Sequence, residues 1–145
     1  MKNLTGLDSQ EQLFYIIAGE VSGDVLGAGL MQSLKKLTLG RAKFVGIGGE
    51  KMIAEGLNSL FPIEELSVMG IFEIIPKIPR LLRMIKEVVD DVFIKNPVAL
   101  ITIDSKGFSF RVSKRVYNRQ RYNQEKIKLV HLVAPTVWAW RPGRA

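Results

Sequence analysis

Residues 13–36, LFYIIAGEVSGDVLGAGLMQSLKK, decide how the rest of the chain is interpreted. They begin with a short apolar run rich in β-forming residues (13–17), which stops at Ala18-Gly19. A run of this length, bounded by glycine, predicts a strand buried on both faces, as strands of parallel sheets are. Apolar residues then recur at helical spacing from residue 25 to residue 37, so a helix is expected directly after the turn.

The turn between this strand and this helix reads Gly19-Glu20-Val21-Ser22-Gly23-Asp24. Glycines let the backbone turn sharply and approach a ligand closely, and Ser22 or Asp24 can cap the helix. Unpaired amide groups at a helix start favour an anionic or sugar-hydroxyl ligand. The turn matches neither G-x-G-x-x-G nor a Walker sequence, so the alternative of a tight turn without a ligand stays open.

A second glycine-rich turn follows the next predicted strand. The strand is predicted over residues 42–47, and the turn is Gly48-Gly49. Residues 50–55 predict a short helix, which Gly56 ends. All strands of a parallel sheet run toward one carboxyl edge, which is where open α/β sheets bind ligands. We therefore expect the two glycine turns to converge at this edge.

The middle of the chain is unusually apolar. Residues 58–61 predict a short strand, and residues 70–83 mix apolar side chains with three bases. Pro76 and Pro79 interrupt this segment, so a kink followed by a helix over residues 79–94 is expected. Bases beside surplus apolar groups suit a protein that rests on anionic lipid, and packing between the sheet and another domain is the alternative.

Residues 98–103, VALITI, are the clearest buried strand, and they deliver Asp104 to the same edge of the sheet. A carboxylate directly after a strand is often a general base or a ligand for a hydroxyl group. The alternative role of Asp104 is to cap the next helix, for which Ser105 and Ser109 compete.

A helix over residues 108–121 and a last strand over residues 128–133 complete the alternation of strands and helices, without a hairpin signal. This order predicts an α/β fold with a doubly wound parallel, Rossmann-like sheet. His131, the single histidine, lies inside the last strand, where it is more typical of packing than of catalysis.

Two tryptophans and two arginines follow that strand: Trp138, Trp140, Arg141 and Arg144. Guanidinium groups pair bidentately with phosphate, and indole rings stack on sugars. The segment therefore predicts part of a glycosyl-phosphate site, and the alternative is that the tryptophans fill the core.

The composition limits the classes of fold and function that these patterns allow. The chain of 145 residues has the length of one domain, and no apolar run approaches the roughly 20 residues of a membrane span. Residues 1–12 are interpreted as a polar leader, too polar for a secretion signal. The chain has no cysteine, which excludes disulfides and thiolate chemistry and fits a cytoplasmic location. The sequence shows no pattern of metal ligands.

The net charge of +7 is concentrated at the end of the chain, where ten bases and two acids follow residue 100. A basic end suits a phosphorylated ligand, a nucleic acid or an anionic membrane surface. Aromatic residues do not alternate with the bases as they do in nucleic-acid-binding proteins, so no nucleic acid partner is expected.

Four motifs in order resemble those of lipid-A-disaccharide synthases: AGEVSGD (18–24), FVGIGG (44–49), LSVMG (66–70) and VWAWR (137–141). The resemblance covers essentially the whole chain after the leader. It implies an inverting glycosyltransferase of the two-Rossmann (B) type, without a metal or a cofactor. Such an enzyme would join UDP-2,3-diacylglucosamine to 2,3-diacylglucosamine 1-phosphate and release UDP. It would be peripheral on the cytoplasmic face of the inner membrane, an anionic surface that residues 70–83 would contact.

The resemblance also implies roles for individual residues. Asp104 corresponds to the family's strand-end aspartate and becomes the candidate catalytic base for the acceptor hydroxyl. The residues implied to line the cleft near the donor phosphates are Glu20, Ser22 and Gly23, and Gly19 is a further implied substrate-binding residue. The other implied substrate-binding residues are Met69 and Gly70 and, on the opposite wall of the cleft, Trp138, Trp140 and Arg141.

Two departures from the family pattern matter. The family has a small residue and then proline after the aspartate, whereas this chain has Ser105 and Lys106, which puts the placement of Phe108 in doubt. Family members are also more than twice as long, and their second domain carries most of the UDP-sugar site. We therefore expect residues 13–145 to be the acceptor-side half, left as a fragment, a split gene product or a decayed gene.

The donor domain would then be absent, or supplied by a separate chain or within a homodimer. Alone, the chain is expected to have little activity, because transfer needs the donor held in line with the acceptor. Two other classes of function stay open. One is a non-catalytic lipid- or membrane-binding module, and the other is a nucleotide-binding domain with flavodoxin-like strand order.

Overall fold

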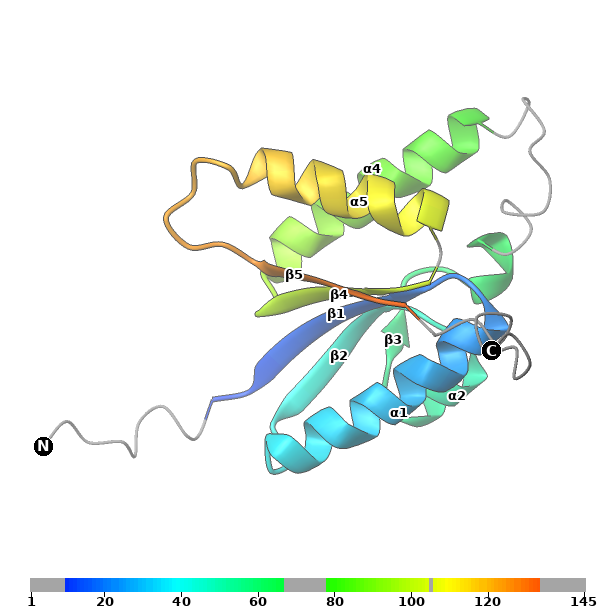
Figure 1. The fold of residues 1–145 in the computed structure, drawn as a ribbon, viewed down its shortest axis with the longest axis vertical. Helices are drawn as coiled ribbons and strands as arrows, with labels where there is room; N and C mark the ends of the chain where they lie inside the picture. Colours follow the sequence, from blue (N-terminus) through cyan, green and yellow to red (C-terminus); the bar gives the residue numbers. More distant parts are fainter. Residues whose placement is uncertain (1–9, 67–77, 105, 134–145) are drawn as a thin grey trace, which may run out of the picture.

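The structure is a computed structural model that describes residues 10–66, 78–104 and 106–133 (Figure 1). In chain order the elements are β1 (Gln12–Ala18), α1 (Val21–Leu37), β2 (Ala42–Ile47), α2 (Glu50–Ala54), β3 (Asn58–Ser59), α4 (Ile78–Lys95), β4 (Ala99–Ile103), α5 (Lys106–Arg119) and β5 (Lys128–Leu132). Residues 63–66 add one helical turn.

The strands form one parallel sheet in the order β3-β2-β1-β4-β5. Helices α1 and α2 cover one face of the sheet, and α4 and α5 cover the other (Figure 1). This arrangement confirms the predicted doubly wound, Rossmann-like sheet. The flavodoxin-like order is wrong, because it would insert β3 between β1 and β4, and these two strands are directly paired.

The central strand β1 is buried on both faces, as its apolar run predicts. Phe14 and Ile16 pack in the cluster beneath α1, where Met31 is also buried. Tyr15 and Ile17 belong to the cluster beneath α4 and α5. Alternate side chains of a strand point to opposite faces, so one strand joins both halves of the core.

Glycine allows the closest contacts on the α1 side. Gly46 in β2 has φ +137°, and a Cβ atom there would collide with the carbonyl oxygen of Ile16. Gly27 of α1 and Gly48 both face the buried side chain of Met52, where a Cβ atom would be too close to its sulfur. These glycines let β2 approach β1 and let α2 pack directly on α1.

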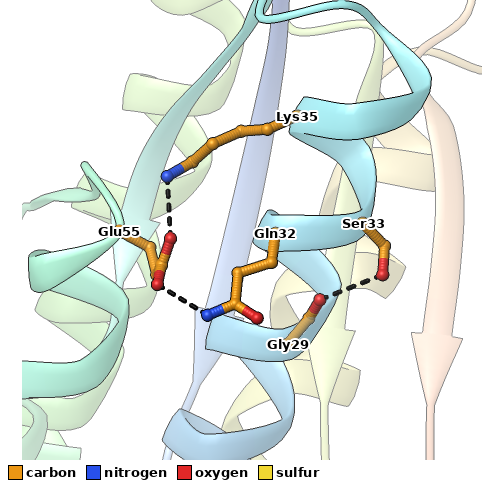
Figure 2. A network of polar contacts seen from close by, with 5 residues as sticks. All are labelled: Gly29, Gln32, Ser33, Lys35 and Glu55. Carbon is orange, nitrogen blue, oxygen red and sulfur yellow. Dashed lines mark hydrogen bonds and ion pairs between the residues drawn. The ribbon is translucent and has the colours of Figure 1, made fainter.

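Polar contacts join the far ends of α1 and α2 (Figure 2). Glu55, just after α2, accepts hydrogen bonds from Gln32 Nε2 at 2.7 Å and from Lys35 Nζ at 2.8 Å. The hydrogen bond from Gln32, followed by the one from Lys35, lowers the pKa of the Glu55 carboxyl group. On α1 itself, the hydroxyl of Ser33 donates to the carbonyl oxygen of Gly29 at 3.2 Å.

The observed element bounds agree closely with the predicted ones, with three exceptions. Helix α1 begins at Val21, inside the segment 19–24 that was predicted as a turn. The short strand expected over 58–61 is reduced to Asn58–Ser59, because the Ser59 hydroxyl donates to the carbonyl oxygen of Phe61 and the chain turns there. Helix α5 runs from Lys106 to Arg119, so it begins and ends two residues earlier than expected.

Candidate functional site

The carboxyl ends of β1 and β4 lie side by side at one edge of the sheet. Their register pairs Ala18 with Ile103, so Gly19 and Asp104 continue from neighbouring positions. The chain leaves β1 for α1 on one face of the sheet and leaves β4 for α5 on the other (Figure 1). At such a switch point the two connections diverge, and open α/β sheets bind their ligands in the crevice between them.

The first glycine turn forms one side of this switch point. Glu20 precedes α1 with an extended backbone (φ −141°, ψ 161°), and its side chain makes no capping hydrogen bond. Ser22 and Asp24 lie inside the helix, so the prediction that one of them caps α1 is wrong. Glu20 and Ser22 are exposed at the edge of the sheet, whereas Gly19 is buried.

Gly23 brings this turn into contact with the end of β4. A Cβ atom at Gly23 would lie 3.4 Å from Cβ of Ala18 and 3.5 Å from Cγ2 of Ile103. The first turn of α1 therefore rests on the ends of both central strands. Since Ile103 directly precedes Asp104, the fold brings together the glycine turn and the strand-end aspartate, which lie about 80 residues apart in the sequence.

Asp104 forms the other side of the switch point. Its backbone is left-handed, with φ +53°, a conformation that is uncommon for residues with a side chain. Its amide group donates to the carbonyl oxygen of Leu132 at 3.0 Å, which continues the pairing of β4 with β5. The conformation costs on the order of 1 kcal/mol. Leu39 and Asn96, which precede β2 and β4 at the opposite edge of the sheet, share it, so it marks a sharp turn and does not by itself mark a site. Asp104 is a candidate site residue because it directly follows β4 at the carboxyl edge of the sheet and is half-buried, and its role as a base stays a prediction.

Ser105 and Ser109 were expected to compete with Asp104 for the cap of α5. Ser109 lies inside α5, fully buried, and within the described part of the chain its hydroxyl has no hydrogen-bond partner. Ser105 lies outside the described residues. Phe108, whose placement was in doubt, is buried in the cluster beneath α4 and α5.

Asp24 makes contacts that sequence reasoning missed. Its carboxylate accepts hydrogen bonds from the backbone N–H groups at the start of α2: Oδ1 from Gly49 and Met52, both at 3.0 Å, and Oδ2 from Lys51 at 3.1 Å. The side chain is only 5% exposed. One signal was present in the sequence, because Asp24 lies on the same helical stripe as the apolar Ala28 and Met31, and a buried carboxylate has to be paired.

These bonds change the interpretation of the second glycine turn. The first amide groups of α2 are bonded to Asp24, and the amide of Gly48 donates to the hydroxyl of Ser59 at 3.2 Å. Gly48 and Gly49 are both buried. The two turns do lie at the same edge of the sheet, but the second one is held by internal bonds.

Five of the predicted site residues lie outside the described residues: Met69, Gly70, Trp138, Trp140 and Arg141. The same holds for residues 1–9 of the proposed leader and for residues 70–77 of the proposed membrane contact. His131 lies on β5 as expected, but its side chain is exposed and Nδ1 is 2.8 Å from the hydroxyl of Thr102. The side chain thus contacts the neighbouring strand β4 and is not buried in the core.

The described ranges show neither a cluster of metal ligands nor a helix that could span a membrane. Residues 10–66, 78–104 and 106–133 contain no group of three or more histidine, cysteine, aspartate or glutamate residues that would hold a metal ion. Among the helices of these ranges, none is both long enough and apolar enough to cross a membrane.

The domain is a Rossmann-like α/β domain, because its strands are parallel and follow the order β3-β2-β1-β4-β5. Its candidate site lies at the switch point, where the ends of β1 and β4 are paired. A family model described as lipid-A-disaccharide synthetase matches residues 14–145. The chain belongs to the lipid-A-disaccharide synthase family. Its fold is the one expected for the N-terminal half of a glycosyltransferase of the B type.

Individual relatives agree with this assignment. The chain is 50% identical over 132 residues to a lipid-A-disaccharide synthase of Paramagnetospirillum magneticum, a match that covers 91% of this chain and 33% of the relative. A synthase of Rhodospirillum centenum is 45% identical over 133 residues, 92% of this chain and 32% of that protein. A probable mitochondrial lipid-A-disaccharide synthase of Arabidopsis thaliana is 43% identical over 143 residues, 96% of this chain and 30% of that protein. The chain thus spans about a third of the length of these relatives.

Proposed function

We propose that this chain forms the acceptor-side domain of an inverting glycosyltransferase of lipid A biosynthesis. The donor is UDP-2,3-diacylglucosamine and the acceptor is 2,3-diacylglucosamine 1-phosphate, and the products are lipid A disaccharide 1-phosphate and UDP. The observation that carries the proposal is that Gly23 of the first glycine turn packs on Ile103, the residue before Asp104, at the switch point, in a chain of this family.

In the proposed reaction the acceptor hydroxyl oxygen attacks the anomeric carbon of the donor sugar. A bond forms between these two atoms while the bond from the anomeric carbon to the UDP phosphate oxygen breaks, and its electron pair leaves with UDP. Asp104 takes the proton of the hydroxyl group, as a general base does. Glu20 and Ser22, which are exposed at the same edge, would line the cleft near the donor phosphates. The reaction uses no metal ion and no redox cofactor.

The proposal includes a location and partners. The protein acts on the cytoplasmic side of the inner membrane, bound peripherally to its anionic surface. The start of α4 supports this contact, because Leu82 is 40% exposed and its neighbour Arg83 is an exposed base. Arg80 is exposed as well, but it is paired with Glu65 at 2.9 Å. The remaining two thirds of the transferase would be supplied in the same chain, by a separate chain or within a homodimer.

The test is a chimera in which residues 14–145 replace the matching third of the P. magneticum synthase. We expect the chimera to turn over the two diacylglucosamine substrates and the 145-residue chain alone to show little or no turnover. D104N should lower kcat by about 100-fold or more, the usual effect of losing a general base. Asparagine tolerates left-handed backbone, so the fold should persist.

Glu87→Gln is the matched control, because it removes an exposed carboxylate on the outer side of α4 and should leave kcat unchanged. Full turnover by the D104N chimera would exclude Asp104 as the base. A folded but inactive wild-type chimera would overturn the proposed activity. If the chain then co-sediments with anionic vesicles regardless of UDP-sugar, the competing function, a non-catalytic membrane-binding module, is favoured.

A further inference from the structure

We propose that Asp24 is a positioning residue, which holds the second glycine turn (46–49) against the first (19–23) and thereby fixes the geometry of the switch point. Its consequence for catalysis rests on the function proposed above. Asp24 itself is buried and is not expected to touch a substrate.

The contacts of Asp24 span two elements. Asp24 lies in the first turn of α1, while its three hydrogen-bond donors, Gly49, Lys51 and Met52, lie at the start of α2. Both carboxylate oxygens are used. A charged acceptor strengthens each of these bonds, and the buried site shields them from water.

Gly49 shows that this arrangement displaces an ordinary helix cap. The backbone of Gly49 (φ −95°, ψ −165°) is extended, a conformation open to any residue, so the turn itself does not require glycine there. A Cβ atom at this position would, however, lie 2.6 Å from Oδ2 of Asp24. Glycine is needed because the carboxylate of Asp24 occupies the space in which a capping side chain of α2 would lie.

A chain of contacts leads from this bond to the candidate base. Asp24 directly follows Gly23, which rests against Ala18 and Ile103, and Ile103 precedes Asp104. On the other side, Gly49 is two residues from the end of β2. One carboxylate therefore ties the exit of β2 to the helix turn that covers the exits of β1 and β4. A serine at position 49 would cap α2 equally well without making this link.

The experiment separates the link from the cap by comparing D24A with the double variant D24A/G49S in the chimera. D24A removes the atoms that a Cβ at position 49 would meet, and serine prefers the extended backbone found there, so the G49S substitution restores a local cap. We expect D24A to lower both stability and kcat. In D24A/G49S the stability should recover, while kcat stays at least about tenfold below wild type, because small misplacements of reacting groups are costly.

Recovery of both stability and kcat in D24A/G49S would overturn the proposal and reduce Asp24 to a cap. D24N guards against a D24A protein that fails to fold, because asparagine keeps the shape and one acceptor oxygen but opposes the N–H of Lys51 with an amide. It should keep most of the stability and still lower kcat. The single variant G49S is the matched control for the clash with Asp24. The G49S substitution should destabilise the wild-type protein, which has Asp24, and should not destabilise the D24A protein.

A second measurement keeps the proposal testable if the wild-type chimera is inactive, an outcome that would refute the proposed function only. Amide hydrogen exchange in the 145-residue chain reports on the turn directly. The N–H of Gly48, bonded to Ser59, should exchange at least about tenfold faster in D24A/G49S than in wild type. Unchanged exchange at Gly48 would show that Asp24 does not hold the turn.

Discussion

The phenol group of Tyr15 donates a 2.9 Å hydrogen bond to Oδ2 of Asp91, which ties the central strand β1 to helix α4. Tyr15 is fully buried, and Asp91 is also paired with Lys95 at 3.0 Å. Within the described residues, this polar bond crosses an interface between sheet and helix that is built of buried apolar side chains. Its contribution to stability can be measured without disturbing the packing.

Tyr15→Phe should lower the free energy of unfolding by about 1–2 kcal/mol, because a buried hydrogen bond to a carboxylate is lost while the ring is kept. Urea or thermal denaturation of the 145-residue chain measures the change. Y117F is the control: Tyr117 is 60% exposed on α5, and its hydroxyl should contribute less than about 0.5 kcal/mol. Equal effects of the two substitutions would contradict the structural role of the Tyr15–Asp91 bond.

Because of Tyr15, we also expect the protein to lose stability at high pH. Burial, and then the hydrogen bond to Asp91, raise the pKa of Tyr15 far above its ordinary value of about 10. The unfolded chain therefore releases a proton that the folded chain keeps, so this contribution is present below pH 10 and is lost as the pH rises beyond it. Unfolding free energies between pH 8 and 11 should fall more steeply for wild type than for Y15F. Parallel curves for the two proteins would speak against this prediction.

Because of Asp90, we expect a smaller loss of stability at low pH. It accepts hydrogen bonds from Arg119 at 2.8 Å and from Lys86 at 3.1 Å, and these contacts, first the one with Arg119, lower the pKa of its carboxyl group. A lowered pKa stabilises the fold above the ordinary value of about 4, and this contribution is lost as the pH falls through the lowered value. Wild type should thus lose more stability between pH 5 and 2.5 than D90N does. E87Q, which removes a neighbouring exposed carboxylate, should follow wild type.

Two glycines should respond in opposite ways to alanine. G46A combines a disfavoured positive φ with a collision against the carbonyl oxygen of Ile16, so it should cost at least about 3 kcal/mol or prevent folding. G29A places a methyl group in open space on α1 and should stabilise the protein by up to about 1 kcal/mol. Melting temperatures of the two variants distinguish these outcomes, and a tolerated G46A would show that β2 can move away from β1.

Much of the fold was predictable because its signals are local. The apolar runs 13–17 and 98–103 predict buried strands, and the helical spacing of apolar residues after residue 25 predicts α1. The placement of Asp104 and of the 19–23 turn at the sheet edge follows from the ends of those strands. Strand 58–61 was overestimated, because a side-chain hydrogen bond of Ser59 ends it early.

The sequence by itself determined which segments become strands and helices, and that Asp104 follows a strand, because these depend on neighbouring residues. Only the tertiary structure decided the order β3-β2-β1-β4-β5 and the partners of Asp24, which lie 25 to 28 residues away along the chain. The physical reason is that the burial of Asp24 and the space beside Gly49 exist only once α1 and α2 have packed on the same face of the sheet. A carboxylate that looked like the cap of its own helix therefore became the cap of the next one.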